Sequence, residues 1–196
     1  MSDLKIVYHP HPALTWKSKD VVKIDAQLQN WVAQMFDLMY EAKGIGLAAN
    51  QVALPYRLFV INPTGDPDQK DQEQAFINPQ IMKGKGSCDA DEGCLSMPEL
   101  FAPVTRYERI TVEAFDVDGT EFGMDLTGLA ARVVQHENDH LDGVMFTDRV
   151  SSDALQELNP LLEDLTKQLQ HQQSDGRLPT NDEMLAELKR LESERT

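Results

Sequence analysis

The stretch Gln135–His140 constrains this chain most, because it carries the pattern His-Glu-x-x-His in a segment that we predict to be helical. On a helix, His136 and His140 lie on one face with Cβ atoms about 5–6 Å apart. Two imidazoles at that spacing can bind one metal ion. Glu137 would then lie beside the open side of the ion, where it can accept a proton from water. We therefore expect the chain to be built around this helix.

The flanks of this motif also favour a helix. Four residues fall on one stripe at helical spacing: Leu129, Val133, His136 and His140. Thr127 or Asp125 is suited to cap the start, and Gly143 is suited to end the helix in the left-handed conformation. The alternative is a surface helix that contains the pattern by chance, since short motifs give false positives.

Composition and charge exclude several classes of function. The chain has 196 residues and a formal net charge of -15, which repels nucleic acid and anionic membranes, and no run of Lys or Arg offsets it. We therefore expect no DNA partner and no membrane partner. We see neither a signal peptide nor an apolar run long enough to span a membrane. The two cysteines, Cys88 and Cys94, suit a reducing compartment, so we expect a cytoplasmic protein.

Hydrophobic spacing predicts a first helix over 25–43, with Asp25 as its N-cap and Gly44 as the left-handed residue after its end. Strands are expected over 57–62, 75–82, 110–116 and 121–126, the last two as a hairpin around Asp118-Gly119. Pro79 restricts the second of these strands to an edge or a bulge. We expect 83–93 to be a glycine-rich loop. Strands without regular alternation with helices indicate an α+β fold.

The character of the chain changes after residue 150, where it becomes polar, acidic and helix-prone. Asn159-Pro160 fits an N-cap followed by the first helical residue, and Thr180 with Glu183 fits a capping box. We predict helices within 151–173 and 180–195. The expected organisation is a catalytic domain over 1–150 and an acidic helical extension over 151–196.

Two further sites allow more than one interpretation. Gly44 to Gln51 is small and apolar, and its glycines either allow another backbone to approach closely or only form a tight turn after the helix. A free cysteine such as Cys94 is usually a small buried hydrophobe, but with two spaced histidines in the chain a thiolate ligand is the competing interpretation. For His9 and His11 we expect no metal-binding role.

Three blocks stand out together: Gly44-Ile45-Gly46-Leu47-Ala48-Ala49-Asn50-Gln51, Glu92-Gly93-Cys94-Leu95-Ser96 and Gln135-His136-Glu137-Asn138-Asp139-His140-Leu141-Asp142-Gly143. They resemble, in order and without a gap, the signatures of the peptide deformylase family, which removes the formyl group from the N-terminus of new bacterial and organellar proteins. The resemblance covers about residues 4–150. It implies small mixed and antiparallel sheets packed around a central metal-bearing helix, with an N-terminal helix and a C-terminal helical appendage.

The resemblance also implies the metal ligands, which would be Cys94, His136 and His140 with water in the fourth position. Three protein ligands leave one position open for catalysis, which agrees with this set. One divalent ion per chain is expected. The family typically uses Fe(II) in cells and also works with nickel or cobalt, while its zinc forms are often poor. Spacing alone does not choose among these ions.

The implied reaction is hydrolysis of a formamide by hydroxide on the metal, releasing formate. The resemblance makes Glu137 the general base and then the general acid. It assigns the oxyanion hole to the side-chain amide of Gln51 and the backbone N–H of Leu95. The implied substrates are N-formyl-methionyl peptides, met transiently near the ribosome exit.

By the same resemblance, the peptide would pair as an extra strand beside Ile45 and Gly46, and its methionine side chain would enter an apolar slot. The expected substrate-binding residues are Ile45, Gly46, Gly93, Leu129, Arg132 and Val133. Of these, Ile45, Leu129, Val133 and the stem of Arg132 would form the walls of the slot, and some or all of the four can instead be plain core.

One departure from the family lies at Glu99-Leu100-Phe101, where many members have a basic residue that can bind the peptide backbone. Arg106 is further along and is expected to pair with Glu92 rather than touch substrate. The sequence therefore does not predict which residues contact the substrate beyond its first residue.

Two alternative functions remain. A zinc protease of the His-Glu-x-x-His type would take a third ligand downstream, for which Glu157 and Glu163 lie in the right range. A binding module with a structural metal would normally need four protein ligands, of which the matching blocks supply three.

Overall fold

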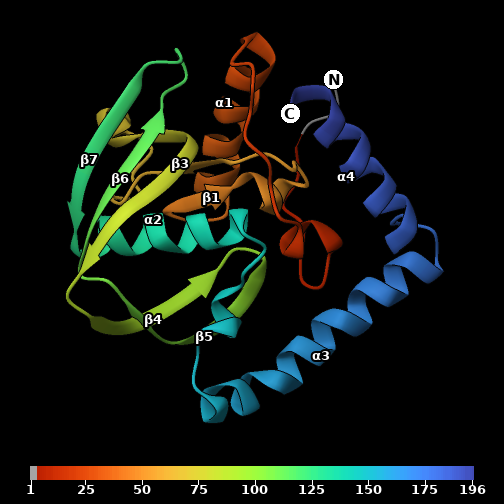
Figure 1. Cartoon of the computed structure of the whole chain (residues 1–196). Helices are drawn as coiled ribbons and strands as arrows, with labels where there is room; N and C mark the ends of the chain where they lie inside the picture. Colours follow the sequence, from red (N-terminus) through yellow and green to blue (C-terminus); the bar gives the residue numbers. More distant parts are fainter. Residues whose placement is uncertain (1–3) are drawn as a thin grey trace.

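The computed structural model describes residues 4–196 as two antiparallel sheets with a helix between them (Figure 1). The helices are α1 (Ala26–Glu41), α2 (Gly128–Leu141), α3 (Ser152–Ser174) and α4 (Asn181–Arg195), with short 3-10 turns η1 (Pro12–Thr15), η2 (Ala49–Val52), η3 (Lys70–Gln72) and η4 (Phe146–Asp148). The strands are β1 (Gly46–Ala48), β2 (Leu58–Ile61), β3 (Gln74–Lys85), β4 (Cys88–Cys94), β5 (Met97–Arg106), β6 (Arg109–Phe115) and β7 (Glu121–Thr127).

The larger sheet has the order β1-β2-β3-β6-β7, and β4 pairs with β5 in a separate hairpin. Helix α2 packs against β1, β2, β6 and β7, and Figure 1 shows it crossing the middle of the molecule between the sheet and the hairpin. The expected α+β class, with sheets around a central helix, is confirmed.

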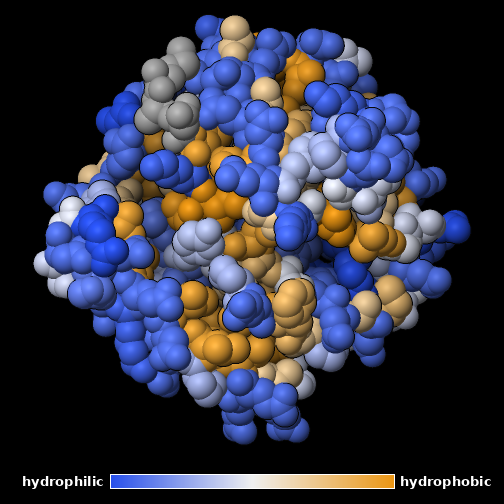
Figure 2. All heavy atoms as spheres, turned by 180° about the vertical axis from the view of Figure 1, so that it is seen from behind, coloured by the Kyte–Doolittle hydropathy of each residue, from blue (hydrophilic) through white to orange (hydrophobic). Residues whose placement is uncertain are grey.

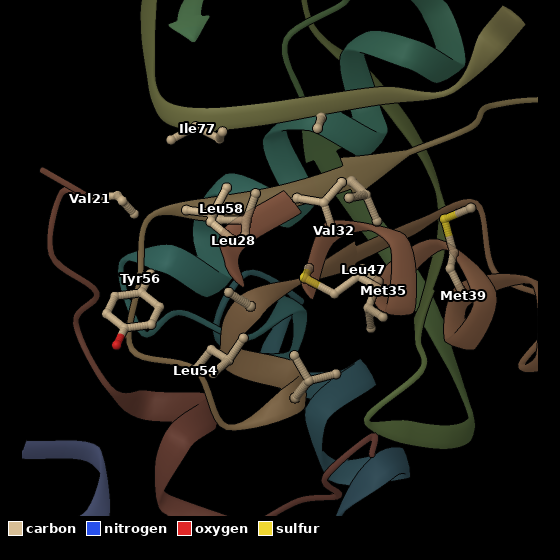
Figure 3. Packing of buried hydrophobic residues seen from close by; sticks show 14 residues of the cluster. Val21, Leu28, Val32, Met35, Met39, Leu47, Leu54, Tyr56, Leu58 and Ile77 are labelled. Atoms are coloured by element: carbon tan, nitrogen blue, oxygen red, sulfur yellow. The ribbon is translucent and has the colours of Figure 1, made fainter. Parts of the chain in front are cut away.

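Helix α1 covers one side of the sheet and forms the first core (Figure 3). The Asp25 carboxylate caps the helix by accepting a hydrogen bond from the Leu28 N–H at 3.1 Å. The buried stripe of this helix packs against apolar residues of β1, β2 and β3; it consists of Leu28, Val32, Met35 and Met39. The predicted helix and its N-cap are therefore confirmed.

The end of α1 differs from the prediction. Lys43, not Gly44, has the left-handed conformation, with φ of 57°. The N–H groups of Lys43 and Gly44 donate to the carbonyls of Tyr40 and Met39, which closes the helix as a Schellman motif. Gly44 serves another purpose, because a Cβ there would lie 2.6 Å from Cδ1 of Leu95. Its small size allows a close approach between this turn and the β4–β5 hairpin.

The β4–β5 hairpin corrects the expected loop over 83–93. β3 continues to Lys85, and β4 pairs residue by residue with β5 from Cys88 to Gly93. The pairing was not evident because β4 is acidic and lacks an apolar buried face, with Glu92 as its one buried side chain. Pro79 lies where the register between β3 and β6 shifts, as expected for a bulge.

Helix α2 begins after Thr127, which occupies the N-cap position without a side-chain cap bond, while Asp125 accepts a hydrogen bond from Thr111. Neither side chain therefore caps the helix. Gly143 has φ of 73° and follows the helix end, as expected. The buried face of α2 joins a second core under the sheet through Ala131, Val133, Val134 and Leu141.

The start of α3 also differs from the prediction. Ser151 is its N-cap and accepts from the Ala154 N–H at 3.2 Å, so Pro160 lies inside the helix rather than at its first residue. Leu158, one turn before the midpoint of this helix, is buried against the β5 side of the molecule, which keeps the earlier turns helical. The capping box of α4, formed by Thr180 and Glu183, is confirmed.

Helix α4 returns to the body of the protein, where the Tyr56 hydroxyl donates to the Leu191 carbonyl at 2.5 Å.

Figure 2 shows the face behind that of Figure 1, where hydrophilic residues cover most of the surface and hydrophobic ones gather in patches between them. Within residues 4–196, none of the helices has both the length and the apolar composition that crossing a bilayer requires.

Candidate active site

Cys94, His136 and His140 come together between α2 and the end of β4, with their ligand atoms all within 4.8 Å of one another. Nε2 of His140 lies 3.2 Å from Nε2 of His136 and 3.4 Å from Sγ of Cys94. Ligands on one tetrahedral ion would be about 3.3 Å apart for two nitrogens and about 3.6 Å for nitrogen and sulfur. The two measured separations are close to these values, so the three residues fit a divalent metal ion.

Local structure explains how a cysteine distant in sequence reaches the two histidines. The helical spacing of His136 and His140 places both rings on the buried side of α2, where they are 8% and 0% exposed. The β4–β5 register shifts after Gly93, so that Cys94 faces Met97 across a tight turn. This turn brings the thiol to the histidines.

Glu92 supports His136 from behind. Its Oε2 lies 3.0 Å from Nδ1 of His136, and two arginines donate to the same carboxylate: Nε and Nη2 of Arg106 at 2.9 and 2.8 Å, and Nη1 of Arg132 at 2.6 Å. Burial opposes ionisation of Glu92, but the hydrogen bonds from Arg106 and His136 outweigh it and lower its pKa to about 2. A carboxylate on the second nitrogen of a ligand histidine fixes the ring and its tautomer. The expected pairing of Arg106 with Glu92 is present.

The pKa values of the two histidines are shifted in opposite directions. Burial lowers the pKa of His136, but hydrogen bonds with Cys94 and Glu92 outweigh burial and raise it to about 10. Burial and the neighbouring His136 hold the pKa of His140 well below its usual range. The pair therefore keeps His140 neutral and lets His136 hold a proton, which a bound cation would displace.

Glu137 is buried beside this group, and burial raises its pKa to about 7. Its Oε2 has no hydrogen-bond partner among the described residues, which is costly for a buried oxygen. Its Oε1 lies against Gly46, where an added Cβ would come within 2.4 Å. A carboxyl group with a free oxygen and a pKa near neutrality is suited to take up and release a proton.

Gln51 lies on η2 at the other side of the thiol. Its Oε1 accepts from the Ala48 N–H at 2.8 Å, and its Nε2 donates toward Sγ of Cys94 at 3.4 Å and Oγ of Ser96 at 3.3 Å. The bond from Ala48 fixes the amide so that its NH₂ group faces the Cys94 side. Leu95, the residue after Cys94, lines the same cavity.

A cavity of about 660 Å³ opens onto these groups, and all six expected substrate-binding residues line it. Val133 also belongs to the core under the sheet, so this residue is both a wall of the cavity and part of the core. The guanidinium of Arg132 is occupied by Glu92 and by the carbonyls of Val104 and Cys88, which leaves its stem for the cavity wall. Glu99 and Phe101, at the departure from the family pattern, lie at the same cavity.

The carboxylates that a zinc protease would need are elsewhere. Glu157 and Glu163 are exposed on α3, and the metal-ligand group found among residues 4–196 contains neither. His11 caps η1, because its Nδ1 accepts a hydrogen bond from the Ala13 N–H. The sequence interpretation also missed two charged neighbours of the site, Asp139 and Arg149. Asp139 lies within the helix motif, but no local pattern connects Arg149 to it.

Comparisons with a family model, with related sequences and with solved structures all indicate the same family. A family model described as polypeptide deformylase matches residues 3–156. A peptide deformylase of Rhodopirellula baltica is 45% identical over 173 residues, which cover 88% of this chain and 86% of that protein. Peptide deformylase 1B of Arabidopsis thaliana is 41% identical over 188 residues, covering 95% of this chain and 67% of that protein. The crystal structure of plant peptide deformylase PDF1B superposes with a TM-score of 0.84 at 41% identity, over 92% of this chain and 96% of that one.

Proposed function

The chain belongs to the polypeptide deformylase family, and from this premise we propose that it removes the formyl group from the N-terminal formyl-methionine of new polypeptides, releasing formate. The observation that carries the proposal is the arrangement of Cys94, His136 and His140 around one point, with Glu137 and Gln51 beside it and an apolar cavity in front.

We propose that these three ligands hold one divalent ion, with Fe(II) as the ion used in cells. A thiolate among the ligands favours softer divalent ions, and nickel, cobalt and zinc are expected to bind the same site. When bound, the ion would supply a Lewis acid for the formyl oxygen and lower the pKa of a water molecule.

Glu137 is proposed to accept the proton of the attacking water and to pass it to the nitrogen of the leaving amine. Its pKa of about 7 suits both directions of transfer near neutral pH. As the formyl carbon becomes tetrahedral, its oxygen gains negative charge. The side-chain NH₂ of Gln51 and the backbone N–H of Leu95 are proposed to donate to that oxygen, and losing one such donor typically costs about 10²–10³ in rate.

The substrate is proposed to bind by its backbone at one edge of the sheet. β1 is the terminal strand of the larger sheet, so the far side of Gly46 is available for pairing with an extended peptide. The methionine side chain would enter the cavity between Ile45, Leu129 and Val133, all of which line it. Gly93 on β4 also lines this cavity, and the ring of Phe101 lies where a Cβ on Gly93 would be, 2.4 Å away.

The catalytic unit is proposed to span 1–150 and the acidic helical extension 151–196. We place the enzyme in the cytoplasm, where nascent chains with a formyl group emerge from the ribosome. With a formal net charge of -15, any contact with the ribosome exit should be transient and salt-sensitive.

The deciding experiment follows amine release from a formyl-Met tripeptide. The protein is purified without oxygen and reloaded separately with iron, nickel or zinc, with the acetyl-Met tripeptide as the matched control substrate. Rapid release from the formyl peptide alone, strongest with iron or nickel, is the expected result. Absence of release with every metal, despite one bound ion per chain, would contradict the proposed function.

A further inference from the structure

Arg149 reaches from the surface into the charged cluster behind the proposed metal ligands. It is the residue that follows η4, it precedes the N-cap of α3 by two residues, and its side chain is 43% exposed. Its guanidinium makes two parallel bonds to the Asp139 carboxylate, Nε to Oδ2 and Nη2 to Oδ1, each at 2.5 Å. Asp139 is buried and immediately precedes His140 on α2.

Asp139 also binds Arg106. Its Oδ2 accepts from Nη1 of Arg106 as well as from Nε of Arg149, so two guanidinium groups share one carboxylate oxygen. The other donors of Arg106, Nε and Nη2, both bind Glu92. Arg106 is therefore held from one side by Asp139 and from the other by Glu92.

Glu92 completes the path, because the Oε2 that accepts from Arg106 also contacts Nδ1 of His136. Every member between Arg149 and His136 is buried, and each bond involves a charged partner, so each orients the next strongly. We propose that Arg149 is a positioning residue for His136, acting through Asp139, Arg106 and Glu92. The inference rests on the proposed metal centre.

Removing the Arg149 guanidinium would change the affinity for the metal ion in two opposite ways. Loss of a positive charge near a bound cation would tighten metal binding by relieving repulsion. Loss of the two parallel bonds would free Asp139 to turn, and Arg106 and Glu92 would follow, so that His136 is no longer held in one orientation. If positioning dominates, metal binding weakens, and the sign of the change distinguishes the two.

The test uses the full chain loaded with Co²⁺, whose visible absorption reports ligand geometry, together with the dissociation constant for Co²⁺ from competition with a chelator. Removing a direct partner of a ligand histidine typically costs about 10–100-fold in affinity, and Arg149 is more remote, so we expect Arg149→Met to weaken binding by about threefold to tenfold. The absorption bands should shift as well.

Arg57→Met is the matched control. Arg57 also binds the C-terminal end of the metal-bearing helix region, through Asn138 and Asp142, but neither of these contacts Glu92 or Arg106. We expect this variant to leave both cobalt readings unchanged. Arg149→Lys keeps the charge but cannot make two parallel bonds, and should therefore give an intermediate loss of affinity.

Unchanged or tighter Co²⁺ binding by Arg149→Met, or an equal loss in Arg57→Met, would overturn the positioning role. If Arg149→Met does not fold by circular dichroism, Arg149→Lys decides, since wild-type affinity in that variant would contradict the need for the paired bonds. Hydrolysis of the formyl-Met tripeptide is measured on the same wild-type preparation. Its absence would refute the proposed function while the cobalt readings still decide the role of Arg149.

Discussion

Glu137 combines a buried carboxyl group with one oxygen that has no partner among the described residues, and burial raises its pKa to about 7. Replacing it with Gln keeps the shape and removes the proton acceptor, while Cys94, His136 and His140 are untouched. We expect Glu137→Gln to keep a full complement of metal and to lose about 10²–10⁴ in turnover of the formyl peptide. Metal content by elemental analysis and amine release check the two parts separately.

The exposed carboxylate Glu157 supplies the control for this change. Glu157→Gln should have wild-type turnover, since this side chain lies on the surface of α3. Normal activity in Glu137→Gln, or loss of its metal, would show that the proposed role of Glu137 is wrong.

Because Gly46 has no side chain, the β1 edge can lie close to Glu137. An added Cβ would come within 2.4 Å of Oε1 of Glu137 and 2.9 Å of Cγ1 of Val133, so Gly46→Ala must displace one of them. Because a displacement of about 1 Å in a catalytic group can cost about 10²-fold, we expect a fall in kcat of at least about tenfold. Steady-state kinetics with the formyl peptide measure it.

Gly123→Ala is the comparison for that variant, because a Cβ on Gly123 would meet its nearest atom at 3.7 Å, an ordinary contact. It should retain the wild-type kcat. Equal kcat values for the two variants would mean that the Gly46 contact does not constrain Glu137.

Among the elements, η1 depends on a histidine that must stay neutral. Nδ1 of His11 accepts from the Ala13 N–H at 3.1 Å and so caps this turn, and burial lowers the pKa of His11 from 6.5 to about 4. A lowered folded-state pKa contributes stability that is complete above pH 6.5 and is lost as the pH falls from 6.5 to 4. The loss should be on the order of 3 kcal/mol.

Asn offers a side-chain oxygen that can cap the same turn without titrating. The free energy of unfolding of His11→Asn, from urea titrations at several pH values, should therefore fall less between pH 6.5 and 4 than that of the wild type. Parallel curves for the two proteins across this interval would exclude a contribution from His11.

Sequence patterns predicted the elements whose burial is periodic. Helix α1, helix α2 and the β6–β7 hairpin all follow the spacing of their apolar residues. Strand β4 was missed because six of its seven residues are not buried, and its strand geometry depends on pairing with β5. Pro160 misled the prediction of α3 because Ser151 caps the helix earlier and tertiary packing of Leu158 holds the turns between them.

The candidate site was predicted where its residues lie in short motifs, as Cys94, His136 and His140 do, and the structure brings these together. Local sequence could not show that Arg149 binds Asp139, since long-range ion pairs leave no periodic trace. It also could not show that Lys43 takes the left-handed position, because the space for Gly44 is set by Leu95, about fifty residues away in the chain.

At the scale of the whole molecule, the last turn of α4 ties the end of the described chain to the start of α1. Nη1 of Arg195 binds the Asp25 carboxylate at 2.9 Å, and its guanidinium lies 4.7 Å from the ring centre of Trp31. The Arg195 carbonyl accepts from the Val22 N–H at 2.9 Å. These contacts close a span of 170 residues.

Arg195→Met should weaken this closure. The variant keeps an apolar stem on Trp31 but loses the ion pair and the cation–π contact, so α4 should open more often without global unfolding. We expect faster hydrogen exchange at the Val22 amide and a lower midpoint of thermal unfolding. Arg190→Met is the matched control, because Arg190 lies on the same helix and its ion pairs, to Glu187 and Glu194, stay within it.

The two variants separate docking of α4 from the helical stability of α4 itself. If loss of either arginine increased exchange at Val22 equally, the effect would come from a weaker helix and not from the contact with α1. If neither changed it, the closure would depend on apolar packing, chiefly of Met184 and Leu188, which are buried on the inner face of α4. Faster exchange in Arg195→Met alone would show that the Arg195 side chain holds the last turn of α4 against the start of α1.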